Sequence, residues 1–185
     1  GRPLGPAKSN VFPHGGRDEH GTDVTFKAWD VLPENLEAKI ATFRESGFLA
    51  SCVTLPYKQD VIRFVDELTE AAEAIGAVNW IFNRKGKLVG HNTDGSGFLR
   101  ALKEKAAFDP KGADAVVFGA GGSARAIIYA LKIAGVNRLT IANRTLEKAQ
   151  GLANEFTSGR FKPTAISINR DELTNYVPYA NLLVN

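Results

Sequence analysis

The chain has 185 residues, of which 44% are hydrophobic and 23% are charged, a composition typical of a soluble globular protein. No apolar run approaches the roughly 20 residues that a membrane-spanning helix needs, and the formal net charge of +3 is too small and scattered to indicate nucleic acid. Cys52 is the only cysteine, which excludes an intrachain disulfide and favours a reducing cytoplasm.

The first part of the chain is predicted to mix strands and helices, because the period of its apolar residues changes from segment to segment. In chain order we expect a strand over 23–31, a helix over 33–47, a strand over 48–55, a helix over 58–76, a hairpin over 77–92 and a helix over 95–108. Residues 9–20 combine Pro13 with a pair of glycines and are assigned no element.

The second part alternates strand and helix, after a stretch over 108–115 whose proline, glycine and charged residues show no apolar period. The expected elements are a buried strand over 115–122, a helix over 123–135, a strand over 138–145, a helix over 146–156 and a strand over 179–185. This alternation predicts an α/β fold with a parallel sheet and helices on its faces.

A glycine-rich turn joins the first strand of the second part to its first helix, in the pattern G-x-G-x-x-A. The first glycine permits a tight turn, the second lets the backbone approach a pyrophosphate, and the small third residue lets helix and strand pack closely. The alternative is an ordinary tight turn, which the strand-loop-helix context disfavours. The candidate cofactor-binding residues are Gly119, Ala120, Gly121, Gly122, Ser123 and Ala124.

The end of the following strand indicates which dinucleotide would bind. An acidic residue there would hold the ribose 2′-hydroxyl of NAD, but the strand ends at Asn143 and Arg144 without a carboxylate. An arginine can hold a 2′-phosphate with two parallel hydrogen bonds, so we predict NADP, with Thr145 and Lys148 as further contacts. The alternative is an exposed arginine at a helix start.

A single lysine, Lys58, stands just after Pro56, between a predicted strand and a predicted helix. A lysine in mid-helix would be solvated, whereas one fixed at a strand end can be aimed at a ligand. Asp94 lies where the hairpin meets the next helix, and Asn79 lies in an apolar run. Taken singly, Asp94 could be a helix N-cap and Asn79 a satisfied core amide.

Five motifs, in their order and spacing, resemble the shikimate dehydrogenase family: "VTLPYK", "AIGAVN", "GHNTDGSGF", "GAGGSARA" and "ANRT". The resemblance extends over residues 30–185. It implies an NADP-dependent oxidoreductase that reduces 3-dehydroshikimate to shikimate in the biosynthesis of chorismate and the aromatic amino acids. It also implies a substrate-binding and catalytic α/β domain over 1–98, an incomplete Rossmann NADP domain over 99–185, and a cleft between them.

The resemblance also implies roles for particular residues. Those that match Lys58 and Asp94 form the catalytic pair of the family, and those that match Ser9, Thr54 and Asn79 contact the substrate. The chemistry agrees, because an ammonium can donate the proton that accompanies hydride transfer and can stabilise the developing oxyanion. A neighbouring carboxylate would orient that ammonium.

Two expected substrate contacts depart from the family pattern. Cys52 stands where the family usually has asparagine, and Ala7 replaces the first of two serines. Because a change of hydrogen-bonding groups can alter discrimination strongly, a quinate or aminoshikimate dehydrogenase paralogue stays open beside a shikimate dehydrogenase. A non-catalytic metabolite or NADP sensor on the same fold is a third alternative, which the retention of both Lys58 and Asp94 disfavours.

The sequence contains no methionine and lacks the C-terminal part of the family, so we expect a truncated or gapped record. No metal is expected, because His14, His20 and His91 show no ligand spacing and the lone cysteine has no partner. The expected partners are small-molecule substrates, with no nucleic acid and no membrane, in a cytoplasmic monomer or homodimer.

Overall fold

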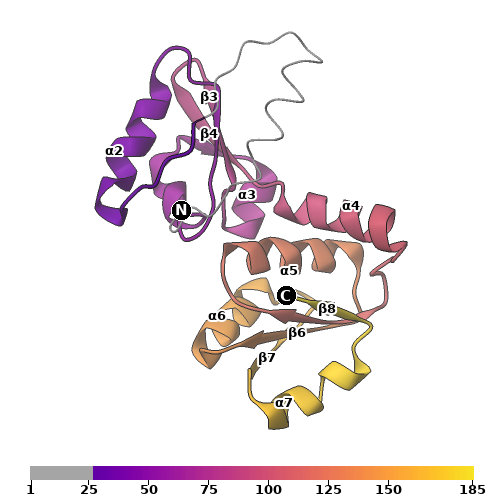
Figure 1. Cartoon of the computed structure of the whole chain (residues 1–185). Helices are drawn as coiled ribbons and strands as arrows, with labels where there is room; N and C mark the ends of the chain where they lie inside the picture. The colour runs from indigo at the N-terminus through magenta and orange to yellow at the C-terminus, as the bar shows by residue number, and fades with distance from the viewer. Residues whose placement is uncertain (1–26) are drawn as a thin grey trace.

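Two four-stranded sheets organise residues 27–185, the part of the chain that the computed structural model describes. The order of the first sheet is β1 (Ala50–Cys52), β3 (Trp80–Arg84), β4 (Lys87–His91) and β2 (Glu67–Leu68). The order of the second is β7 (Thr164–Ser167), β6 (Arg138–Asn143), β5 (Asp114–Phe118) and β8 (Leu182–Val184). Figure 1 shows the sheets in separate halves, with helices α4 (Asp94–Ala106) and α5 (Gly122–Ala134) side by side where the halves meet. The predicted α/β class is confirmed.

The first sheet is built around the predicted hairpin. β3 and β4 pair antiparallel, and the chain reverses at Lys85 and Gly86, whose φ angles of 57° and 88° are left-handed. A two-residue turn of this kind matches the right-handed twist of the flanking strands. β1 pairs antiparallel with β3, but it is shorter than the strand predicted over 48–55, because pairing with β3 stops at Cys52 and turns follow.

Of the two elements predicted before the first sheet, the helix is present and the strand is not. Helix α2 (Leu36–Ala41), with the 3₁₀ turns η2 (Pro33–Asn35) and η3 (Thr42–Arg44) at its ends, confirms the helix expected over 33–47. The strand expected over 23–31 is wrong for its described part, which has no strand assignment. Alternation alone makes no strand there, because a strand also needs a neighbour with which to pair.

The helix predicted over 58–76 is wrong, because a strand interrupts it. The structure has the 3₁₀ helix η4 (Asp60–Phe64), then β2, then helix α3 (Glu70–Ile75). The carboxylate of Asp66 accepts a 2.7 Å hydrogen bond from the N–H of Leu88, and β2 continues parallel to β4. Pairing with a strand distant in sequence therefore outweighs the local helical period of the apolar side chains.

The second sheet confirms the predicted parallel arrangement. Each pair of neighbouring strands is parallel, and β6 and β7 lie on one side of β5 while β8 lies on the other. The strand order therefore reverses between β5 and β8, and ligands of such sheets bind beyond the carboxyl ends of the strands at that reversal. The glycine-rich turn follows β5 at this place.

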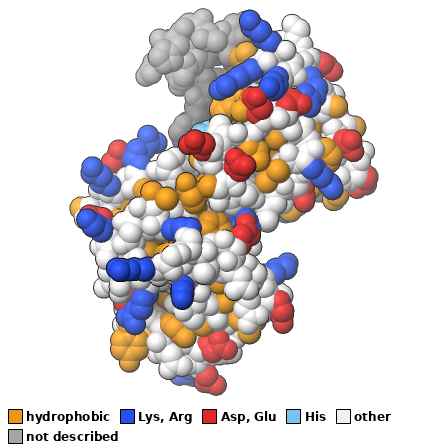
Figure 2. Space-filling view, turned by 180° about the vertical axis from the view of Figure 1, so that it is seen from behind, with side chains coloured by type: hydrophobic (Ala, Val, Ile, Leu, Met, Phe, Trp, Pro, Cys, Tyr) orange, Lys and Arg blue, Asp and Glu red, His pale blue; other side chains and the backbone are white. Residues whose placement is uncertain are grey.

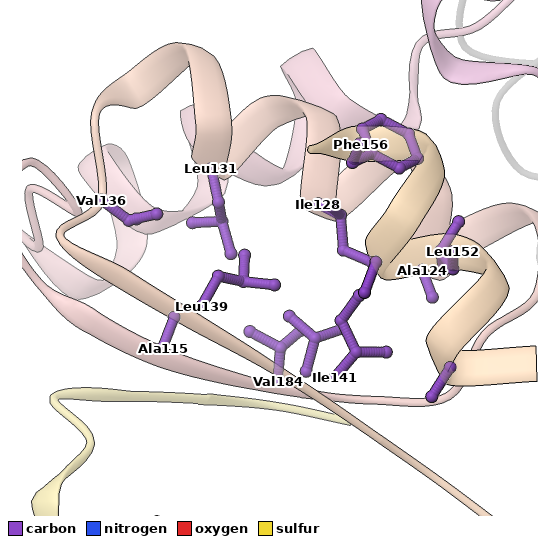
Figure 3. Packing of buried hydrophobic residues seen from close by; sticks show 13 residues of the cluster. Ala115, Ala124, Ile128, Leu131, Val136, Leu139, Ile141, Leu152, Phe156 and Val184 are labelled. Carbon is purple, nitrogen blue, oxygen red and sulfur yellow. The ribbon is translucent and has the colours of Figure 1, made fainter. Parts of the chain in front are cut away.

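The core of the second half lies in two layers, one on each face of the sheet. Ala115 and Val117 of β5 pack with side chains of α5 and α6 (Leu146–Phe156), in the cluster that Figure 3 shows. Val116 packs in another cluster, with Leu173 of helix α7 (Arg170–Thr174). Because successive residues of a strand point to opposite faces, α5 and α6 cover one face and the α7 segment covers the other.

Strand β7 and helix α7 were not predicted from the sequence. These elements have 4 and 5 residues, too few for an apolar period to be detected. They hold each other in place, because the carboxylate of Glu172 in α7 accepts a 2.8 Å hydrogen bond from the N–H of Ser167 in β7. The other strands and helices expected after residue 95 are confirmed, although β5 ends four residues before its predicted end and β8 begins three residues after its predicted start.

The surface carries charges of both signs. Figure 2 shows Lys and Arg side chains over both halves of the face in view, with Asp and Glu side chains among them. Within residues 27–185, no helix is long and apolar enough to cross a membrane.

Candidate active site

Lys58 lies in the turns that connect β1 to η4. Its backbone is held in place because its carbonyl oxygen accepts a 2.6 Å hydrogen bond from the N–H of Val78. The residue is only 8% exposed, and its Nζ lies 2.6 Å from Oδ2 of Asp94 and 3.0 Å from Oγ of Ser123. The lysine singled out in the sequence therefore has a buried amino group, with a carboxylate from α4 and a hydroxyl from α5 as partners.

Asp94 is the first residue of α4 and does not act as its N-cap. The cap position belongs to Thr93, whose side chain caps no N–H group. Both carboxylate oxygens of Asp94 face the first half of the chain: Oδ2 bonds Lys58, and Oδ1 accepts a 2.8 Å hydrogen bond from Nδ2 of Asn79. The N-cap alternative is therefore wrong, and the side chain belongs to the site around Lys58.

Two buried asparagines hold Asp94 in this position. Asn79, 6% exposed, also donates a 2.9 Å bond to Oγ1 of Thr93 and accepts a 3.0 Å bond from the N–H of Thr93. Asn92, 3% exposed, donates to the carbonyl oxygen of Ala77 and accepts a 2.9 Å bond from the N–H of Asp94. Sequence reasoning missed Asn92, although a polar run between a hairpin strand and a helix is a usable signal.

Thr54 and Cys52, two further positions of the predicted substrate site, lie at the end of β1. Thr54 is exposed just beyond β1. Cys52 has an exposed edge, but the protein packed around its thiol raises the pKa of that thiol by desolvation, and the charge of nearby Lys58 opposes the shift. Ser9 and Ala7 lie outside the described residues.

The glycine-rich turn has the geometry of an anion site. Gly119 has a φ of 109°, which favours glycine, and a Cβ added at Gly119 or Gly121 would meet no atom within 4 Å. No side chain caps the first N–H groups of α5, which begins at Gly122. Ala124 is buried against the core, and Ala120 packs beside it. Open backbone at a helix N-terminus suits the pyrophosphate of a dinucleotide.

The end of β6 presents the residues predicted to select the dinucleotide. Asn143 donates a 2.8 Å hydrogen bond to the carbonyl oxygen of Thr145, which shapes the turn into α6. Arg144 and Lys148 are exposed and form no ion pair within the described chain. This positive, carboxylate-free strand end suits a phosphate on the ribose.

Among residues 27–185, no group of three or more His, Cys, Asp and Glu side chains could hold a metal ion, and His91 bonds Oγ1 of Thr69 at 2.8 Å. A hollow of about 610 Å³ lies at the amino ends of β5, β6 and β7, the edge opposite the glycine-rich turn. The residues that line this hollow include neither Asp94 nor Ser123, the two partners of the Lys58 amino group.

A Rossmann-type parallel sheet with an open glycine-rich turn, next to a second α/β half that contributes a buried Lys–Asp pair, defines a two-part α/β protein of the Rossmann class. The family model "Shikimate dehydrogenase substrate binding domain" matches residues 1–81, and the model "Shikimate / quinate 5-dehydrogenase" matches residues 101–184. The chain belongs to the shikimate dehydrogenase family, as its motifs indicate.

Known relatives agree in sequence and structure. A protein of Methanopyrus kandleri named shikimate dehydrogenase (NADP(+)) is 40% identical over 186 residues, which cover 100% of this chain and 64% of that protein. Shikimate 5-dehydrogenase from Thermus thermophilus, in complex with NADP(H) and shikimate, has a TM-score of 0.78 and 31% identity, covering 91% of this chain and 66% of that one. The ligand-free 5-ketofructose reductase of a Gluconobacter species has a TM-score of 0.75 and 35% identity, covering 90% and 60%. The chain thus spans less than two thirds of the length of these proteins.

Proposed function

We propose that the whole protein catalyses the NADP-dependent reduction of 3-dehydroshikimate to shikimate. The observation that carries this proposal is the contact of Lys58 with Asp94, 2.6 Å apart, next to the first turn of α5. Membership of the shikimate dehydrogenase family supports it. The shikimate dehydrogenase (NADP(+)) of Methanopyrus kandleri and the Thermus thermophilus enzyme in complex with NADP(H) and shikimate point to the same substrate and cofactor.

The reaction places a hydride on a carbonyl carbon and a proton on its oxygen, and NADPH supplies the hydride when bound. Lys58 is the group that donates the proton and stabilises negative charge as it develops on the oxygen. Asp94 holds the amino group of Lys58 in place, and Asn79 holds Asp94. In the reverse direction, the neutral amine of Lys58 accepts the proton of the substrate hydroxyl.

The cofactor proposal rests on two parts of the second half. The pyrophosphate would lie on the backbone of Gly119, Ala120, Gly121, Gly122, Ser123 and Ala124, where the N–H groups at the start of α5 have no side-chain cap. The 2′-phosphate would contact the turn made by Asn143, Arg144, Thr145 and Lys148. Exposed positive charge without a carboxylate at this turn favours NADP over NAD.

The substrate contacts proposed for the first half are Ser9, Thr54 and Asn79. Asn79 already bonds Asp94 and Thr93, so a substrate hydroxyl would share or replace one of these bonds. Cys52, next to this site, is only a weak hydrogen-bond donor. Because Cys52 stands where the family usually has asparagine, quinate should be tested beside shikimate.

The test is a turnover assay of the full-length protein at alkaline pH, which follows the absorbance of the reduced cofactor. NADP⁺ is supplied with shikimate and then with quinate, and both assays are repeated with NAD⁺. Turnover fastest with shikimate and NADP⁺ would support the proposal, and a preference for quinate would assign the paralogue. Tight NADP⁺ binding without turnover on either substrate would favour the sensor. The Lys58→Met variant is the control for background oxidation.

The proposed division into a catalytic domain over 1–98 and a nucleotide domain over 99–185 stays a prediction, as does a cytoplasmic monomer or homodimer. Helix α4 runs across the proposed boundary and packs along α5. Limited proteolysis followed by mass spectrometry of the fragments would locate the boundary. Cleavage that leaves α4 attached to the second half would move the domain boundary to the start of α4.

A further inference from the structure

The amino group of Lys58 has partners from both halves of the molecule. Asp94 reaches it from the end of the first half, at 2.6 Å, and Ser123 reaches it from the glycine-rich end of α5, at 3.0 Å. An ammonium has three N–H donors, so these two bonds leave one donor for a substrate oxygen. Two fixed partners on different elements set the direction of the third donor more narrowly than Asp94 could alone.

The start of α5 is closely packed against Lys58. A Cβ added at Gly122 would lie 2.8 Å from Cβ of Lys58 and 3.6 Å from Cβ of Ala77. Glycine at position 122 therefore lets the helix approach closely enough for the hydroxyl of Ser123 to bond the lysine. Ser123 is half-buried in the first turn of a 13-residue helix, a rigid support for a short side chain.

We propose that Ser123 is a positioning residue for Lys58, which fixes the direction of the amino group toward the substrate in addition to any contact with the cofactor. The proposal rests on the proposed function of Lys58 and extends it to a residue of the nucleotide-binding turn. The hydrogen bond between Ser123 and Lys58 also connects the proposed cofactor site with the proposed substrate site. A shift of the first turn of α5 would therefore move a hydrogen-bond partner of Lys58.

The first test compares Ser123→Ala with Ser123→Thr in the full-length protein, by steady-state kinetics with shikimate and NADP⁺. We expect kcat to fall roughly 10- to 100-fold in Ser123→Ala, with the KM for NADP⁺ within about threefold of the unchanged protein. Ser123→Thr keeps the hydroxyl and should recover most of kcat. Ser96→Ala is the matched control, since it removes a hydroxyl from the first turn of α4 that bonds only the carbonyl oxygen of Thr93.

A second test does not depend on turnover. Trace acetylation with acetic anhydride, followed by mass spectrometry of the peptide that contains Lys58, measures how freely its amine reacts. Loss of the Ser123 hydroxyl should raise the acetylation rate of Lys58 by about 3- to 10-fold, whereas Ser96→Ala should leave it unchanged.

The outcomes separate the two proposals. A raised KM for NADP⁺ with unchanged kcat and unchanged acetylation would overturn the inference and leave Ser123 as a cofactor contact only. If the unchanged protein shows no turnover, the proposed function fails, and the acetylation rates alone decide whether Ser123 positions Lys58.

Discussion

The guanidinium of Arg125 in α5 donates a 2.7 Å hydrogen bond from Nε to the carbonyl oxygen of Ile75, the last residue of α3. This bond joins the two halves of the molecule at the place where the chain leaves α3 for β3. The other two nitrogens of the Arg125 guanidinium pair with the carboxylate of Glu155 in α6. Because the carbonyl groups at a helix C-terminus carry partial negative charge, a cation there stabilises the helix and holds it against α5.

Replacing Arg125 by methionine should lower the free energy of unfolding by roughly 1–3 kcal/mol, because the carbonyl of Ile75 loses a charged donor at a buried position. Urea denaturation followed by circular dichroism measures the change. The matched variant Glu155→Gln should cost less than about 1 kcal/mol, since Glu155 is 52% exposed and water replaces its pairing. Equal losses in the two variants would show that the ion pair, and not the bond to Ile75, holds the junction.

Removal of the amino group of Lys58 should abolish most of the activity without loss of cofactor binding. We expect Lys58→Met to lower kcat by about 10²- to 10⁴-fold, the usual contribution of a general acid. The dissociation constant for NADP⁺, measured by fluorescence titration, should change by less than about threefold, because the predicted cofactor contacts do not include this side chain. Lys87→Met, which removes an exposed lysine paired with Glu67, is the control and should keep full activity. Wild-type kcat in Lys58→Met would refute the assignment.

Arg144 should decide between the two dinucleotides. Its replacement by alanine should raise the KM for NADP⁺ by roughly 10- to 100-fold and leave the KM for NAD⁺ nearly unchanged, because only NADP carries the 2′-phosphate. Arg160→Ala removes another exposed arginine, at the opposite edge of the sheet, and serves as the control. A similar rise in KM for both cofactors would mean that Arg144 contacts a part that they share.

Two glycine-to-alanine changes should have opposite effects on stability. Alanine at Gly122 would place a Cβ 2.8 Å from Cβ of Lys58, so we expect a loss of roughly 1–3 kcal/mol and of activity. Alanine at Gly151, inside α6 and with no atom within 4 Å of the added Cβ, should gain about 0.5–1 kcal/mol from its higher helix propensity. Thermal unfolding of both variants measures the difference. A neutral Gly122→Ala would show that α5 can move away from Lys58.

The first sheet should lose stability in acid through Asp66. The hydrogen bond from Arg44, together with that from the N–H of Leu88, holds the pKa of Asp66 below its usual value. The carboxylate therefore stabilises the fold at pH values above the ordinary pKa of aspartate, about 3.9, and this contribution falls as pH drops toward the lower folded value. Asp66→Asn should be less stable than the unchanged protein at pH 7, and the gap should narrow as the pH falls below the ordinary pKa of aspartate toward the lower folded value. A gap that persists in acid would show that charge plays no part.

Much of the second half could be predicted from the sequence, because its elements depend on short-range interactions. The turn at Gly119 to Ala124 and the helix stop at Gly135, which has a φ of 80°, follow from backbone preferences of single residues. In the first half, the hairpin that reverses at Gly86 follows from the same preference. Periodic apolar side chains indicate α5 and α6, since each presents one continuous face to the sheet.

Sequence motifs alone determined the family, the glycine-rich turn and the choice of Lys58 and Asp94 as candidate catalytic residues, because these are local patterns of residue type. Only the tertiary structure decided that residues 67–68 form a strand, since a two-residue strand exists only through its pairing with β4. It also decided that the amine of Lys58 meets a residue 36 positions away and another 65 positions away. Such contacts depend on how whole elements pack, and no local period of the sequence contains that information.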